Sequence, residues 1–148
     1  MIYAGIDPGF ATGGVALLSG HWCEVHDLPI FEGQGIDCTG LIDILRSADI
    51  DMCIVEKQSS RPKQGVVSAF KIGMGYGQIL ACLAAAKVPH KIVTPTQWKK
   101  ALCLSKDKDS SRMRAMQLYP SAAPMLKRKK DEHRAEALLL ASYGEATA

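Results

Sequence analysis

The sequence lacks the features of exported and membrane-embedded proteins. No apolar run approaches the roughly 20 residues that a membrane-spanning helix needs. The opening residues, Met-Ile-Tyr-Ala-Gly, lack the basic segment of a signal peptide. We therefore expect a soluble protein of the cytoplasm that has no membrane partner.

Paired metal-binding cysteines are also missing. The five cysteines are widely spaced, and none forms the Cys-x-x-Cys pair that is typical of zinc sites and redox motifs. We expect buried thiols in a reducing compartment. The length of 148 residues, 47% of them hydrophobic, fits one globular domain over residues 1–148.

Basic residues are scarce in the first part of the chain. Residues 1–56 hold nine acidic residues and one basic residue, whereas residues 57–148 hold six acidic and seventeen basic residues. Solvated helix surfaces explain most charge runs, but three separate basic clusters favour a polyanionic partner. The clusters are Lys57, Arg61 and Lys63; Lys99, Lys100, Lys106, Lys108, Arg112 and Arg114; and Lys127, Arg128, Lys129 and Lys130.

The order of predicted elements indicates an α/β architecture. Apolar runs bounded by turn residues predict three antiparallel strands at residues 2–7, 14–19 and 21–27, and a helix at 39–47. A buried strand at 51–56, a helix at 64–87 and a strand at 90–94 follow, and Pro95 opens another helix. The last helices are predicted at 110–119 and 131–143, the second ended by Gly144.

Two acidic residues end predicted strands. Asp7 lies in an Ile-Asp-Pro-Gly segment followed by glycines that would let a bulky anion approach the backbone, although Asp-Pro-Gly is also common in simple turns. Glu56 ends an apolar strand, where a carboxylate is either exposed at the sheet edge or held by a cation. Asp7 and Glu56 can share an ion only if their strands are neighbours.

Polar side chains open the last predicted helix. His133 and Glu136 stand at i and i+3 and project from the same face. Alternatively, Asp131 caps the helix and Glu132 and Glu136 interact favourably with its dipole, without any metal. We expect both interpretations to apply to different residues, with Asp131 as the cap.

Together these residues predict a metal site. Carboxylates from two strand ends, with a carboxylate and a histidine from one helix, offer ligands that suit Mg²⁺ or Mn²⁺. Two such ions roughly 4 Å apart can activate a water and stabilise the leaving oxygen during attack on a phosphodiester. The acidic cluster would bind the metal, and the basic clusters would hold nucleic acid.

The order and spacing of these motifs resemble the RuvC-type Holliday junction resolvases over nearly the whole chain. The resemblance implies an RNase H-like α/β fold with a mixed five-stranded sheet, antiparallel first three strands, and helices on both faces. It also implies a homodimer that cuts four-way junctions, in the cytoplasm of a bacterium or a phage-infected cell. The catalytic residues would be Asp7, Glu56, His133 and Glu136, binding two Mg²⁺ or Mn²⁺ ions.

This sequence departs from the family's pattern at two places. Glu136 stands where many relatives have Asp, and Asp131 or Glu132 could take the place of His133. The family's aromatic wedge after the strand-four glutamate is absent, because Gln58-Ser-Ser-Arg occupies that segment. The nearest aromatic residue, Phe70, lies in a predicted helix, where core or interface packing is favoured.

The predicted DNA contacts are basic residues. Lys99, Lys100, Lys106 and Lys108 resemble the family's DNA-contacting lysines, and we expect them to contact phosphates without reading sequence. Lys57, Arg61, Lys63 and Arg112 complete the set.

Two features of the middle of the chain concern packing. Gly73 and Gly77 lie on one face of the 64–87 helix and would let another helix approach, within the monomer or across a dimer. Trp98 is predicted to pack in the core rather than to stack on bases.

Two other functions compete with the nuclease hypothesis. The first is a sugar-kinase or chaperone-like ATPase, whose fold needs two such domains and therefore a longer chain. The second is a catalytically silent RNase H-like module that binds nucleic acid or protein. The set of acidic residues argues against the silent module.

Overall fold

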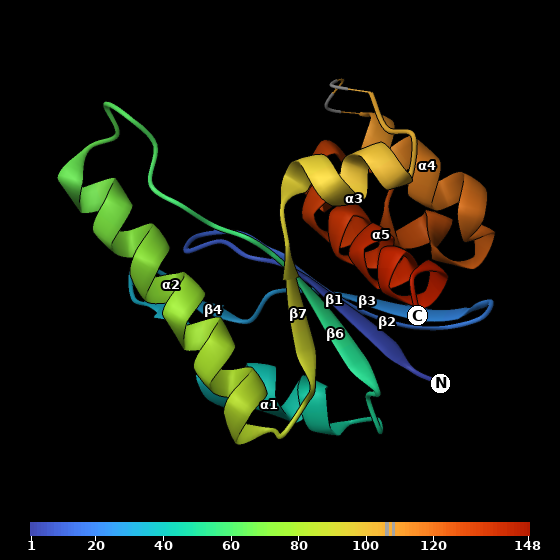
Figure 1. Ribbon diagram of the computed structural model, residues 1–148, viewed down its shortest axis with the longest axis horizontal. Coiled ribbons are helices and arrows are strands. Elements are labelled where there is room, and N and C mark those ends of the chain that lie inside the picture. The colour runs from blue at the N-terminus through green and yellow to red at the C-terminus, as the bar shows by residue number, and fades with distance from the viewer. Residues whose placement is uncertain (106, 108) are drawn as a thin grey trace.

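The computed structural model describes residues 1–105, 107 and 109–148 (Figure 1). The strands are β1 (Tyr3–Asp7), β2 (Gly14–Ser19), β3 (Trp22–Asp27), β4 (Ile30–Phe31), β5 (Gly35–Ile36), β6 (Met52–Glu56) and β7 (His90–Val93). The α-helices are α1 (Cys38–Arg46), α2 (Val66–Ala85), α3 (Pro95–Ala101), α4 (Ser110–Leu118) and α5 (Glu132–Ala146). Two short 3-10 helices, η1 (Pro120–Met125) and η2 (Lys129–Asp131), connect α4 to α5.

The main sheet has five strands in the order β3-β2-β1-β6-β7. β1, β2 and β3 pair antiparallel through short connections, whereas β6 pairs parallel with both β1 and β7. A parallel pair needs a crossover connection, and α2 supplies it between β6 and β7. The predicted mixed sheet with three antiparallel opening strands is therefore confirmed.

Helices cover both faces of this sheet, as Figure 1 shows. Strand side chains alternate between the two faces: Tyr3 and Ile54 pack in one core with α4 and α5, whereas Ala4 and Val55 pack in the other with α1 and α2. Gly5 brings α5 onto the sheet, because a Cβ there would overlap the α5 backbone. The close approach of α5 positions the residues of its first turns above the end of β1.

Two details of the fold differ from the sequence predictions. The small β4–β5 hairpin was not predicted, because two-residue strands are too short to show a periodic pattern. Helix α5 continues past Gly144 to Ala146. Gly144 serves close packing instead of helix termination, since a Cβ there would lie 2.7 Å from Cγ1 of Ile54.

Helix α2 is long and apolar enough, by length and composition, to cross a membrane. Of its most apolar stretch, 22% is buried. The expectation that no segment has this character was therefore wrong, because the polar positions of α2 are too few to lower its mean hydropathy. One side of α2 packs against α1 and β5, and Ile79 and Leu83 lie in the core on that side.

Candidate active site

Asp7 and Glu56 lie side by side at one end of the sheet. β1 and β6 are parallel neighbours, and Ile6 is paired with Val55, so the next residue of each strand is one of the two acids. Both side chains are buried, with 5% of Asp7 and 9% of Glu56 exposed. The condition that these two strands be neighbours is met.

Helix α5 brings His133 to this pair of carboxylates. Its Nδ1 lies 2.7 Å from Oδ2 of Asp7. The hydrogen bond with the Asp7 carboxylate raises the pKa of His133 above its ordinary value, although partial burial opposes the shift. Gly14 makes this approach possible, because a Cβ there would overlap the backbone of His133. The glycine was predicted to admit an anion, but α5 occupies that space.

Trp98 holds Glu56 from the other side. The indole Nε1–H donates to Oε2 of Glu56 at 2.7 Å, and the tryptophan is completely buried. Burial raises the pKa of Glu56, and the nearby charge of Asp7 raises it further. The predicted core location of Trp98 is confirmed, but its contact with a candidate metal ligand was missed.

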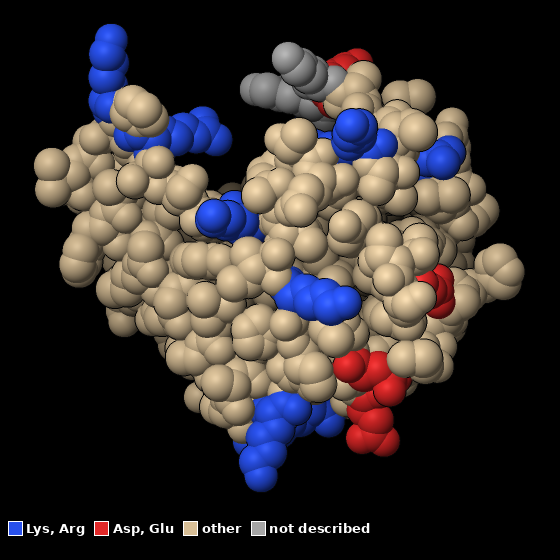
Figure 2. Space-filling view, in the orientation of Figure 1, with Lys and Arg blue, Asp and Glu red and all other residues tan. Residues whose placement is uncertain are grey.

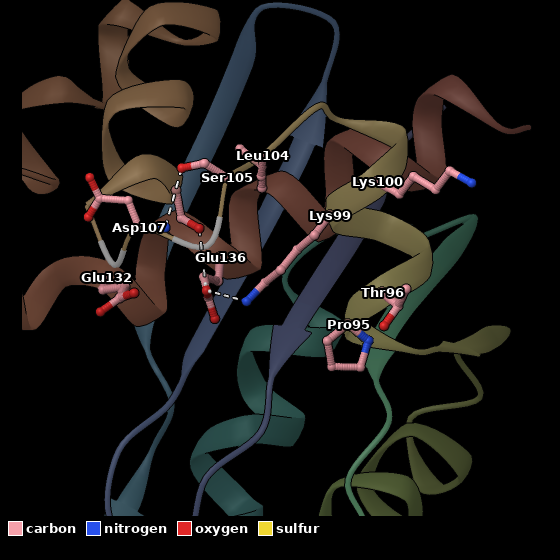
Figure 3. A pocket seen from close by; sticks show the side chains of 10 residues that line it. Pro95, Thr96, Lys99, Lys100, Leu104, Ser105, Asp107, Glu132 and Glu136 are labelled. Atoms are coloured by element: carbon pink, nitrogen blue, oxygen red, sulfur yellow. Dashed lines mark hydrogen bonds and ion pairs between the residues drawn. The ribbon is translucent and has the colours of Figure 1, made fainter.

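Glu136 lies one turn of α5 beyond His133 and faces a cavity of about 540 Å³. Its carboxylate forms an ion pair with the Lys99 ammonium and accepts a hydrogen bond from the Ser111 hydroxyl, each at 3.3 Å. Figure 3 shows Lys99 reaching across the cavity to Glu136, whereas Lys100 points away. Burial, followed by the charge of Asp7, raises the pKa of Glu136 to about 7.

The three carboxylates fit a divalent cation in charge and donor chemistry. Burial is the main cause of the raised pKa values of Glu56 and Glu136, and the charge of the nearby Asp7 carboxylate raises both further. Hard carboxylate oxygens are the ligands that Mg²⁺ and Mn²⁺ prefer. Within the described residues, however, no three ligand side chains are already gathered as a metal-binding group. Binding would require Asp7 and Glu136 to turn from His133 and Lys99.

Asp131 does not take part in this cluster. Its carboxylate accepts hydrogen bonds from the backbone N–H and the guanidinium of Arg128, and these bonds lower its pKa. Asp131 is the N-cap residue of α5, as predicted, but its side chain makes no cap hydrogen bond to that helix. The Arg128 guanidinium neutralises the Asp131 carboxylate. Glu132 borders the cavity beside Glu136 and stays the alternative to His133 (Figure 3).

No protein-family model and no curated protein sequence matches the chain significantly. Solved structures do match. RuvC of T. thermophilus in complex with a Holliday junction substrate has a TM-score of 0.75 and 21% identity, and the alignment covers 100% of this chain and 96% of RuvC. A second Thermus thermophilus RuvC structure has a TM-score of 0.69 and 19% identity, covering 99% and 96%. The fowlpox virus Holliday junction resolvase has a TM-score of 0.61 and 16% identity, covering 100% of both chains.

This chain has the RuvC fold. The similarity spans the entire sheet and the helices on both its faces, so the predicted RNase H-like class is confirmed. The candidate residues Asp7, Glu56, His133 and Glu136 all lie at one end of this RuvC-like sheet.

The predicted DNA-contacting residues fall into three groups on the RuvC fold. Exposed basic side chains border the site: Lys57, Arg61 and Lys63 follow β6, and Lys100 lies on α3. Lys99 instead pairs with Glu136. Arg112 donates to the carbonyls of Leu126 and Lys127 and to Asp109, so its guanidinium is engaged within the fold. Lys106 and Lys108 lie outside the described residues.

A groove leads away from Glu56 between the β6–α2 connection and α3. Lys57, Arg61 and Gln64 line one side, and Pro95 lies on the other. In Figure 2, Lys and Arg side chains surround the hollow between the N-terminal end of α2 and the α3–α4 region. The acidic cluster therefore opens toward a basic surface.

Proposed function

We propose that this protein is a metal-dependent endonuclease that cuts phosphodiester bonds in branched DNA, in particular four-way junctions. The observation that carries this proposal is the convergence of Asp7, Glu56 and Glu136 at one sheet end, beside a basic groove, in a chain with the RuvC fold. The structural neighbours are, by their names, Holliday junction resolvases.

Asp7, Glu56, Glu136 and His133 would hold two Mg²⁺ ions, for which Mn²⁺ can substitute. When bound, such ions activate a water and stabilise the charge that develops on the phosphodiester and its leaving oxygen. Asp7 and Glu56 present their carboxylates from adjacent, rigid strand ends, which fixes their separation. Without metal, His133 can hold a proton beside Asp7, because its pKa is raised there, and it would have to release that proton to bind a cation.

The basic surface would hold the DNA by its phosphates. Lys57 and Arg61 line the groove, and Lys63 of the β6–α2 connection and Lys100 of α3 are exposed. These four side chains can neutralise phosphates without reading bases. A protein of this kind would select DNA by its branched shape.

We also propose that the nuclease is a homodimer. Helix α2 exposes an apolar and small-residue stripe made of Val66, Phe70, Gly73, Gly77, Ala81 and Ala84. Phe70 is 71% exposed, and a Cβ on Gly73 or Gly77 would meet nothing within 4 Å. These glycines therefore serve no close contact among the described residues of the monomer, and a second copy of α2 could approach them. Two copies would give two active sites for a symmetric junction.

The same proposal places the protein in the cytoplasm of a bacterium or a phage-infected cell. All five cysteines are free thiols, which suits a reducing compartment. Its substrate, DNA, is also found there.

A cleavage panel tests the function. Wild-type protein is incubated with four-way, three-way, flap and linear DNAs in Mg²⁺, in Mn²⁺ and in chelator. We expect metal-dependent cuts in the four-way junction and none in linear DNA. An intact junction in both metals would favour the catalytically silent module, and tight ATP binding would favour the ATPase.

A further inference from the structure

Glu56 has a partner unlike those of the other candidate ligands. Asp7 pairs with the titratable imidazole of His133, and Glu136 pairs with the ammonium of Lys99. Glu56 accepts a hydrogen bond from the indole Nε1–H of Trp98, at 2.7 Å. Within residues 1–105, 107 and 109–148, no other side chain donates to this carboxylate. An indole is neutral and only donates, so it can orient Glu56 while leaving its negative charge unneutralised.

The backbone around Trp98 is fixed on both sides of the contact. Val93 is paired with Glu56 in the sheet, and the N–H of Lys57 donates to the Val93 carbonyl at 2.7 Å. The chain then enters α3 through a capping box formed by Thr94 and Gln97. Trp98 is therefore the fourth residue of a short, capped helix that begins directly beside Glu56.

The indole itself is enclosed in the core. Trp98 is completely buried and packs in the core with α4 and α5. A buried indole N–H needs an acceptor, and here that acceptor is Oε2 of Glu56. One carboxylate oxygen is thereby held, and Oε1 is left for another partner.

We infer that Trp98 is a positioning residue, which orients the Glu56 carboxylate so that its free oxygen can bind a divalent cation. The inference rests on the proposed metal-dependent function. Outer partners that hold metal ligands typically change metal affinity about 10- to 100-fold when they are removed. Trp98 would thus set the affinity for metal without touching either the metal or the DNA.

The test measures Mn²⁺ affinity in the full-length protein. Trp98→Phe keeps an aromatic ring but removes the donor, and Trp22→Phe is the matched control because Trp22 is 46% exposed on β3. Free Mn²⁺ is counted by electron paramagnetic resonance during a titration. We expect Trp98→Phe to weaken Mn²⁺ binding about 10-fold or more and Trp22→Phe to leave it unchanged.

A double-mutant cycle with Glu56→Gln separates positioning from a general loss of structure. If Trp98 acts through Glu56, Trp98→Phe costs little additional Mn²⁺ affinity in the Glu56→Gln background. The inference would be overturned if the losses of Mn²⁺ affinity in the two single variants multiply in the double variant. It would also be overturned if Trp98→Phe binds Mn²⁺ with wild-type affinity. If wild-type protein binds no Mn²⁺, the proposed metal-dependent function fails as well, so the two failures are distinguishable.

A fluorescence titration covers the case in which Trp98→Phe does not fold. In the Trp22→Phe variant, Trp98 is the single tryptophan, because the chain has two. We expect Mg²⁺ to change the Trp98 emission, with a midpoint that matches Mg²⁺ displacement of bound Mn²⁺. Emission that stays constant at saturating Mg²⁺ would overturn the inference.

Discussion

Nδ1 of His133 lies 2.7 Å from Oδ2 of Asp7, across 126 positions of the sequence. The contact ties the last helix to the first strand at the point where the candidate metal ligands meet. Because the Asp7 carboxylate raises the pKa of His133, the pair favours an imidazolium beside a carboxylate. A bound cation would neutralise the Asp7 carboxylate in place of the imidazolium. Metal binding and protonation of His133 should therefore oppose each other.

Divalent cations should therefore stabilise the protein most above neutral pH. At pH 8, Mg²⁺ at a concentration 100 times its dissociation constant adds about 2.7 kcal/mol to the free energy of unfolding. Thermal unfolding in Mg²⁺ and in chelator measures this gain. We expect Asp7→Asn to lose most of it, whereas Asp43→Asn, on the exposed side of α1, keeps it. A wild-type protein without any shift would contradict the metal site.

The pKa of Glu136 predicts how stability depends on pH when metal is removed. The folded protein binds a proton on Glu136 up to about pH 7, whereas the unfolded chain releases it near pH 4.5. Folding therefore takes up a proton in this window, and the free energy of unfolding falls as pH rises through it, by at most about 3 kcal/mol. The raised pKa values of Glu56 and His133 act in the same direction.

Urea unfolding in chelator between pH 5 and pH 8 tests this dependence. Glu136→Gln should flatten the decline and be more stable than wild type at pH 8. Glu32→Gln, an exposed control, should follow the wild-type curve. The prediction fails if the wild-type free energy is constant or rises over this range.

The main parts of the fold could be predicted because they depend on local periodicity. Continuous apolar runs ending in Asp7 and Glu56 identified β1 and β6, and the i, i+3 spacing placed His133 and Glu136 on one face. Their gathering required β1 and β6 to be neighbours, which no local pattern specifies but which the family resemblance implied.

Side-chain partners could not be predicted, because they depend on tertiary contacts between distant segments. Lys99 was expected to contact phosphate, yet it pairs with Glu136, 37 positions later (136 − 99). Asp131 matched the pattern of a helix cap, but its carboxylate accepts hydrogen bonds from two guanidinium nitrogens of Arg128 instead. The Thr94–Gln97 capping box was a local signal that could have placed Trp98 close to the end of β6.

Loss of a candidate ligand should separate cleavage from binding. Asp7→Asn and Glu56→Gln keep side-chain size but remove a charge, and we expect junction cleavage to fall roughly 1000-fold or more. Junction affinity should change little, because phosphate contacts come from other residues. Cleavage assays and gel-shift titrations on the same four-way junction give both quantities. Retained cleavage by Asp7→Asn would exclude its proposed role.

Exposed lysines beside the groove should determine the salt dependence of binding. Each phosphate contact adds about one unit to the slope of log affinity against log salt, so Lys57→Gln with Lys100→Gln should reduce the slope by about two. Lys87→Gln with Lys91→Gln removes the same charge away from the groove and should leave the slope unchanged. Equal slopes in wild type and in the Lys57 and Lys100 variant would refute their role.

The exposed stripe of α2 should control assembly. A charged side chain at Phe70 would be buried without a partner in a dimer that packs this stripe, which is costly. Central interface residues contribute about 2 kcal/mol or more, so Phe70→Asp should weaken dimerisation at least roughly 30-fold. Met113→Asp, at a residue of α4 that is 57% exposed, is the matched control. Sedimentation equilibrium distinguishes the outcomes: a wild-type monomer, or an unchanged dimer in Phe70→Asp, would show that α2 does not form the interface.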